Sequence, residues 1–268
     1  MPGIRFLNSI AAFLMLIRSR ILHFATVLAC ISSIRASDAV DTLVKEATAA
    51  ESRFETKAAL ALFLEANTAR PNDVAILQKI SRQYSDATLD TNNVAEKKRL
   101  CTEALAYARR AAELDPKDAV NQLSLAICYG KLGTYSDTRT KIEYSRLVKD
   151  YADAAVALNP NYDYAHHVLG RWNYEVASLG FGTRLIVRVI YGGLPSASTA
   201  EAVRQLQRAV QLSPHLPAHR VELGFALLAD GQRDAARETF QEALKMPIVE
   251  KYDTEAFRRA REALDGLK

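Results

Sequence analysis

The residues of this chain whose types and spacing could do metal chemistry are two histidines and the acidic residue that follows them. His215 and His219 are four residues apart, and Glu222 follows three residues later. On a helix this spacing brings the three side chains toward one face, which a metal site permits. Pro217 lies between the two histidines, however, and no fourth ligand is evident. We therefore interpret them as a surface pair near a helix end, and we expect no metal or cofactor.

Motifs that would build an enzyme active site are missing from the sequence. It contains no Gly-Lys-Ser/Thr phosphate loop, dinucleotide-binding fingerprint or nucleophile elbow. Arg171 and Glu175, four residues apart, have no neighbouring nucleophile and instead predict a partly buried ion pair that holds the segment after them. Cys30, Cys101 and Cys128 show no metal-binding or redox spacing, and the last two are expected to be small buried helix residues. We predict a protein without catalytic activity.

The excess of positive charge is confined to the N-terminus. The chain has 35 lysines and arginines against 31 acidic residues, and residues 1–37 hold four of the arginines and no acidic residue. Subtracting those 4 from 35 leaves 31 basic residues, which balance the 31 acidic ones. A neutral body argues against nucleic-acid binding driven by bulk charge, and we expect no nucleic-acid partner.

Residues 1–37 read as a targeting or membrane-anchoring leader. Two apolar runs, 6–17 and 21–34, are separated by Arg18 and Arg20, and each is shorter than the roughly 20 residues that a spanning helix needs. The arginines and the missing acids fit a mitochondrial presequence, the second run fits a secretory signal, and the whole fits a retained interfacial anchor. We predict a mitochondrial or membrane-associated protein, and the sequence leaves the membrane and the cleavage of the leader open.

The rest of the chain repeats one helical pattern five times. In each copy small or apolar residues recur at steps of four and then three, which places them on one helix face. A proline follows shortly after and ends the helix. The five copies are Ala59, Phe63, Ala66 before Pro71; Ala104, Ala108, Ala111 before Pro116; Val148, Ala152, Ala155 before Pro160; Ala202, Leu206, Ala209 before Pro214; and Ala236, Phe240, Ala243 before Pro247.

A second helix precedes each of these and carries a small residue where it meets its partner. Leu125-Ala126 aligns with Leu223-Gly224, and Leu169-Gly170 aligns with both. Each unit is therefore helix, turn, helix and proline, which resembles the tetratricopeptide repeat. We predict an all-α, tetratricopeptide-like superhelix over residues 38–268, in which each repeat covers the apolar stripe of its neighbour.

Two segments depart from the repeat. Residues 253–267 are expected to form a capping helix that buries Ala256, Phe257 and Ala260 and turns Arg259 largely away. Residues 178–197 are an insertion in which glycines break the preceding helix and an apolar run forms a short helix or an extended piece. Two hypotheses explain it: a plug over the end of the repeat groove, or an apolar patch or pocket wall for a partner or a lipid chain.

The insertion and the helix before it resemble one family. Gly170, Arg171, Trp172, Tyr174, Glu175, Val176 and Ala177, followed by Arg184 and the turn Gly192-Gly193-Leu194-Pro195, are similar to the regulator of microtubule dynamics proteins. The resemblance implies a non-enzymatic, tetratricopeptide-like protein. Its members associate with microtubules and spindle poles, and some sit on mitochondria or other membranes through the N-terminus. The leader departs from the purely cytosolic members.

Together these features predict a helical-repeat adaptor that binds microtubules or another protein. Basic clusters such as Lys97-Lys98-Arg99 could meet the acidic tubulin surface. The alternative is a carrier or tether that holds a membrane lipid or other apolar ligand in the repeat groove, and the alternative location is the cytoplasm, cytoskeleton or spindle pole. A charged groove would favour the adaptor and an apolar groove the carrier. The candidate partner or ligand surface comprises Arg171, Trp172, Tyr174, Glu175, Arg184, Arg188 and Tyr191.

Overall fold

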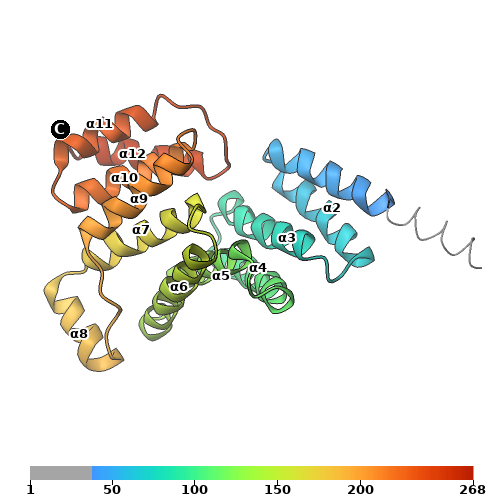
Figure 1. Ribbon diagram of the computed structural model, residues 1–268, viewed down its shortest axis with the longest axis horizontal. Coiled ribbons are helices and arrows are strands. Elements are labelled where there is room, and N and C mark those ends of the chain that lie inside the picture. Colours follow the sequence, from blue (N-terminus) through green and yellow to red (C-terminus); the bar gives the residue numbers. More distant parts are fainter. Residues whose placement is uncertain (1–37, 268) are drawn as a thin grey trace, which may run out of the picture.

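The computed structural model describes residues 38–267, and all regular structure within them is helical (Figure 1). A helix over residues 38–52 comes first. The elements after it are α2 (Thr56–Ala69), α3 (Val74–Ala87), the short 3-10 helix η1 (Thr88–Asp90), α4 (Val94–Leu114), α5 (Ala119–Thr134), α6 (Thr138–Leu158), α7 (Asp163–Ala177), α8 (Phe181–Tyr191), α9 (Thr199–Leu212), α10 (Pro217–Ala229), α11 (Arg233–Ala243) and α12 (Asp253–Asp265). The all-α prediction is confirmed. The leader predicted for residues 1–37 lies outside the described residues.

The repeat residues predicted from spacing are all buried. They lie on α2, α4, α6, α9 and α11, the second helix of each pair. The first four of these helices end two residues before the prolines expected to stop them. Because short buried alanines alternate with single large residues such as Phe63 and Phe240, paired helices approach closely and interdigitate. The tetratricopeptide-like pairing is therefore confirmed.

Glycines on α7 and α10 set the closest of these approaches. A Cβ added at Gly170 would lie 2.4 Å from Cγ of Leu206 on α9, and one added at Gly224 would lie 2.5 Å from Cε1 of Phe240 on α11. Real Cβ atoms do not come that close to another carbon. The small residue of each Leu-Gly pair is thus required by the helix opposite it.

Five helices begin with a side-chain cap. In each, the side-chain oxygen of the capping residue accepts a hydrogen bond from the amide three residues later, which satisfies one of the first unpaired N–H groups. The capping residues are Asp73, Asn93, Asp118, Asp137 and Ser198.

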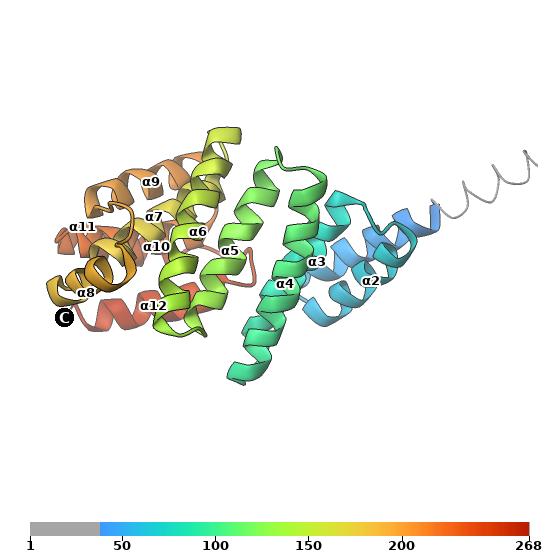
Figure 2. The same ribbon diagram turned by 90° about the horizontal axis from the view of Figure 1, so that it is seen from below.

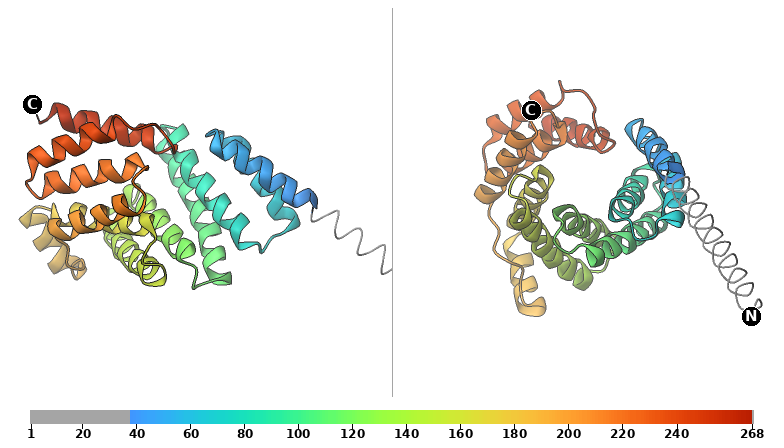
Figure 3. Two further views of the ribbon diagram at one scale, coloured as in Figure 1. Left: turned by 45° about the horizontal axis from the view of Figure 1, so that its top comes forward. Right: turned by 45° about the vertical axis from the view of Figure 1, so that its right-hand side comes forward.

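The stacked helices curve into a ring. Figures 2 and 3 show the pairs lying side by side in chain order, with the first helices and the segment before α12 facing each other where the ring closes. Two ion pairs join these ends. Arg82 Nη2 lies 3.0 Å from Glu250 Oε1, and Lys251 Nζ lies 2.5 Å from Asp90 Oδ2. Closure therefore rests on contacts between residues at opposite ends of the repeat domain.

The insertion forms α8, which lies outside the ring rather than across it (Figure 3). The hypothesis of a plug over the groove is wrong, because α8 lies outside the ring, where α6 is its main contact. Gly180 separates α8 from α7, but Gly182 lies within α8 and breaks nothing. The predicted turn is confirmed by Gly192 and Gly193, which have φ of 77° and 84°, in the left-handed region that glycine adopts without strain.

The capping helix is confirmed as α12, with Ala256, Phe257 and Ala260 buried. One detail is wrong: Arg259 turns inward, because a buried carboxylate lies within its reach. Cys101 and Cys128 are buried, as expected. Between residues 38 and 267, no helix is both long and apolar enough to cross a bilayer.

Candidate functional site

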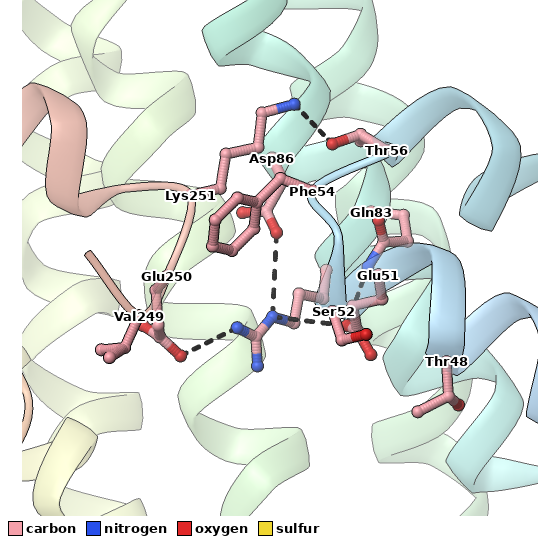
Figure 4. Close-up of a pocket in the computed structure, with 11 residues that line it drawn as sticks. Thr48, Glu51, Ser52, Phe54, Thr56, Gln83, Asp86, Val249, Glu250 and Lys251 are labelled. Carbon is pink, nitrogen blue, oxygen red and sulfur yellow. Dashed lines mark hydrogen bonds and ion pairs between the residues drawn. The ribbon is translucent and has the colours of Figure 1, made fainter. Parts of the chain in front are cut away.

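A pocket of about 200 Å³ lies where the two ends of the ring meet (Figure 4). We call it the closure pocket. Its walls come from the first helix and the loop after it, from α3, and from the segment between α11 and α12. The lining residues are Thr48, Glu51, Ser52, Phe54, Thr56, Arg82, Gln83, Asp86, Val249, Glu250 and Lys251.

Five charged side chains line the closure pocket. Arg82 contacts three carboxylates: Glu250 at 3.0 Å, Glu51 at 3.6 Å and Asp86 at 3.7 Å. Burial alone would lower the pKa of the Arg82 guanidinium, but these carboxylates raise it above its ordinary value, so it stays a cation. Lys251 donates to the Thr56 hydroxyl. The pocket can therefore offer both donors and acceptors to a polar ligand such as a peptide.

Phe54 stands at the rim of the closure pocket in an unfavourable conformation (Figure 4). Its φ of 60° makes it the one non-glycine with positive φ among residues 38–267. Its side chain is 39% exposed, so little packing compensates for the strain. Strained residues of this kind gather at binding and switching sites. An exposed aromatic ring over a charged pocket suits recognition of a protein segment.

Replacing Phe54 with glycine should raise the free energy of unfolding by about 0.5 to 1 kcal/mol, because glycine adopts the left-handed region freely. Urea unfolding measures this. Phe54→Ala is the matched control: it also removes the ring but keeps a Cβ in the strained conformation, so it should bring no gain. A Phe54→Gly variant less stable than Phe54→Ala would show that strain is absent.

A second polar cluster is buried between α7, α10 and α12. Glu222 is fully buried and accepts from Tyr174 Oη at 2.5 Å and from Arg259 Nη1 at 2.5 Å. Arg171 Nη1 lies 3.7 Å from the same carboxylate, and Tyr252 Oη donates to it at 3.3 Å. Burial raises the pKa of Glu222, but Arg171 and Arg259 outweigh it and lower the pKa to about 2. Glu222 on α10 thus binds side chains of both α7 and α12, and the cluster connects the capping helix to the repeats.

Next to it lies a chain of two histidines and a carboxylate. His219 is fully buried, so the prediction of a surface histidine pair is wrong for this residue. Its ring packs against the ring of His167 on α7. His219 Nε2 lies 3.1 Å from Asp163 Oδ2, and His219 Nδ1 lies 2.9 Å from His167 Nδ1. Because the carboxylate only accepts, a neutral His219 carries its proton on Nε2, and His167 then donates from Nδ1. Within residues 38–267 no group of three or more His, Cys, Asp or Glu is placed to hold a metal.

Stability should fall as the pH drops from 7 to 5, because burial lowers the pKa of His167 from 6.5 to about 3. Below pH 6.5 the unfolded chain takes up a proton that the folded chain refuses, so unfolding is favoured, by about 1 to 2 kcal/mol at pH 5. His167→Gln should reduce this loss, measured by urea unfolding at both pH values. The exposed His215→Gln is the control, and an equal reduction there would contradict the assignment.

The comparisons with known proteins bear on this arrangement. A family model for regulator of microtubule dynamics protein 1-3 matches residues 38–268. This chain belongs to that family.

Several relatives carry the name of this family. Regulator of microtubule dynamics protein 1 of Bos taurus is 33% identical over 144 residues, which cover 53% of this chain and 45% of the relative. The Mus musculus protein 1 is 28% identical, covering 73% and 65% of the two chains, and the Xenopus laevis protein 3 is 28% identical, covering 70% and 41%. The chain thus spans between 41% and 65% of these relatives.

Solved structures share the fold. A thermophilic TPR protein of Thermus thermophilus aligns with a TM-score of 0.61 at 20% identity, over 84% of this chain and 98% of that chain. The pilF protein of Pseudomonas aeruginosa aligns with a TM-score of 0.50 at 12% identity, over 87% and 90%. At these identities the likeness concerns architecture alone.

The seven residues predicted as a partner surface in this family member fall into two separate places. On α7, Trp172 is buried and donates from Nε1 to the Ser145 carbonyl at 2.8 Å, and Tyr174 belongs to the Glu222 cluster. The Arg171–Glu175 pair forms at 2.7 Å, with both side chains more than a third exposed, and it holds no part of the insertion.

The remaining predicted residues lie on α8. Arg184 and Arg188 are exposed, and the Tyr191 ring lies under the Arg139 guanidinium at 5.9 Å. Neither group contributes to the closure pocket, which sequence reasoning missed. Arg82 and Glu250 are 168 residues apart in the chain, so no local spacing connects them. The partner surface itself stays a prediction.

Proposed function

We propose that this chain is a non-enzymatic helical-repeat adaptor that holds a segment of a protein partner in the closure pocket. The observation that carries the proposal is a pocket of charged side chains with an exposed, strained aromatic residue at its rim. Arginine and aromatic side chains in desolvated pockets contribute most of the binding energy at many protein interfaces. A peptide's main-chain N–H and C=O groups would match the donors and acceptors of Arg82, Glu51 and Glu250.

Microtubules are the partner that we propose. The relatives are named as regulators of microtubule dynamics, and they support this choice for the part of their length that the chain spans. The basic clusters predicted to meet an acidic surface are partly neutralised: Arg258 pairs with Glu255 and Glu262, and Arg99 pairs with Glu96. Exposed Lys98 is not so paired, so it is the better candidate for long-range attraction.

Co-sedimentation of residues 38–268 with microtubules tests this proposal. The four apolar core clusters all lie within this segment, so it is expected to fold alone. We expect binding at low salt that weakens as salt is raised. Phe54→Ala should weaken it several-fold, whereas Leu114→Ala, which removes an equally exposed apolar side chain on α4, should leave it unchanged. Absence of binding at low salt would contradict the microtubule proposal.

The membrane link is proposed through residues 1–37, which deliver the chain to a mitochondrion or hold it on a membrane. The apolar and basic character of that segment supports this. A fluorescent fusion of the full chain should show a mitochondrial or membrane pattern. A fusion that begins at residue 38 should lose this pattern. A membrane pattern that survives the truncation would contradict the role of residues 1–37, and a cytoplasmic or cytoskeletal pattern of both fusions would contradict the membrane link itself.

The alternative, a lipid or other apolar ligand in the groove, receives less support. An acyl chain prefers an apolar lining, whereas most of the side chains lining the closure pocket are charged or polar. Native mass spectrometry of the purified chain distinguishes the two. Retained lipid would favour the carrier, and its repeated absence would favour the adaptor.

A further inference from the structure

Helix α8 exposes more large apolar side chains than any other described helix. Five of its apolar side chains are between 50% and 80% exposed. At about 100° per residue, they fall on roughly half of the helix circumference and form one continuous face, the α8 apolar face. The members of this face are Phe181, Leu185, Ile186, Val189 and Ile190.

The opposite edge of α8 is the one that holds it to the molecule. Val187 is its one buried residue, and the Tyr191 ring packs under Arg139. Arg146 on α6 donates from Nε to the Gly193 carbonyl at 3.1 Å and also donates to the Tyr191 carbonyl. The α8 apolar face is therefore directed away from the ring, and Figure 1 shows α8 standing apart from the repeat helices.

The charge around the α8 apolar face is of one sign. Residues 176–200 contain Arg184 and Arg188 and no aspartate or glutamate. Both arginines are exposed, and they project from α8 between its apolar face and the edge that contacts α6. A short helix with a broad apolar face flanked by arginines is typical of helices that lie in the interface of anionic membranes.

We propose that α8 docks on an anionic lipid surface, with its apolar face at the boundary of headgroups and acyl chains and with Arg184 and Arg188 at the phosphates. A lipid surface fits better than a protein because no wall stands beside α8 to form a groove, and a bilayer needs none. The closure pocket takes no part in this contact. It therefore stands whether or not the chain binds microtubules.

A tryptophan placed on α8 tests the contact in the full-length chain. The native Trp172 is 4% exposed, so it reports the core. The variant Phe181→Trp adds a probe on the α8 apolar face, and Leu158→Trp adds one at another exposed site, at the far end of α6. The vesicles are made of phosphatidylcholine with brominated acyl chains, with and without phosphatidylserine. Bromine quenches only tryptophans that enter the bilayer.

With phosphatidylserine present, Phe181→Trp should shift to the blue and be quenched, while the wild type and Leu158→Trp should not. Adding Arg184→Gln and Arg188→Gln should weaken the partitioning by roughly 30-fold, at about one kcal/mol for each arginine. Adding Val189→Glu should abolish quenching. This set reports on α8 even if residues 1–37 bring the chain to the vesicle.

Three results would overturn the proposal. One is vesicle binding in which Phe181→Trp is quenched no more than Leu158→Trp. The second is a blue shift of Phe181→Trp on adding microtubules but not vesicles, which would assign the α8 apolar face to a protein. The third is a dimer in sedimentation equilibrium that Val189→Glu abolishes, which would assign it to a second copy. Circular dichroism of each variant confirms that the helices are retained.

Discussion

Glu222→Ala should lower the free energy of unfolding by about 3 to 5 kcal/mol, because it leaves the largely buried Arg259 without its carboxylate partner and takes one of two carboxylates from Arg171, which keeps Glu175. Glu222 is fully buried, and Arg259 contacts it at 2.5 Å. The hydroxyl of Tyr174, 2.5 Å from the other carboxylate oxygen, also loses its acceptor. An unpaired buried charge costs far more than an exposed one, so the effect should appear as loss of the C-terminal repeats and α12.

Urea unfolding followed by the fluorescence of Trp172 and by circular dichroism measures this effect. Glu242→Ala is the matched control, since it removes an ion pair with Arg220 whose glutamate side chain is 64% exposed. That pair should contribute no more than about 0.5 kcal/mol. Equal effects of the two substitutions would show that Glu222 is not a buried anion.

Acid should reveal the same carboxylate. The Arg171 and Arg259 charges outweigh burial and lower the pKa of Glu222 from 4.5 to about 2. Its contribution is therefore present in full above pH 4.5 and is lost as the pH falls toward 2, since protonation then favours the unfolded chain. Glu222→Gln, which cannot titrate, should be less stable at neutral pH and should lose less stability over that interval. If Glu222→Gln loses as much stability as the wild type between pH 4.5 and 2, Glu222 is not the source of the acid sensitivity.

Gly170→Ala should destabilise the chain by about 3 kcal/mol, at the upper end for overpacked cores. The added Cβ would lie 2.4 Å from Leu206 Cγ, 2.9 Å from its Cδ1 and 3.1 Å from the Ala202 carbonyl oxygen. Relief would require α7 to move away from α9. Alanine is preferred to glycine inside a helix by about 1 kcal/mol, so the clash must exceed this gain.

Gly182→Ala is the opposing control. Gly182 also lies within a helix, but a Cβ there meets nothing within 4 Å. Only the helix preference remains, so this substitution should be neutral or stabilise α8 by up to about 1 kcal/mol. Opposite signs at the two glycines, measured by thermal and urea unfolding, would establish that packing and not propensity places Gly170. A stabilising Gly170→Ala would contradict the helix contact.

Much of the fold could be predicted because its information is local. Ala202, Leu206 and Ala209 share a helix face through spacing alone, and Pro214 ends that helix wherever the chain lies in space. A capping helix follows from the apolar stripe that the last repeat must cover. Helix periodicity therefore determined which residues enter the core of the repeats.

Local spacing failed where partners come from distant elements. His219 was predicted on the surface and Arg259 away from the core. Both turn inward, because Asp163 lies within contact distance of His219 and Glu222 lies within contact distance of Arg259.

The amino-acid sequence by itself determined the helices, their pairing and the family to which the chain is similar. Tertiary structure alone decided that the ring closes through Arg82 and Glu250, that a buried carboxylate joins α10 to α12, and that α8 stands free with its apolar face outward. The physical reason is that burial of a polar group depends on its partner, and the superhelical curvature brings these partners together from residues far apart in the chain.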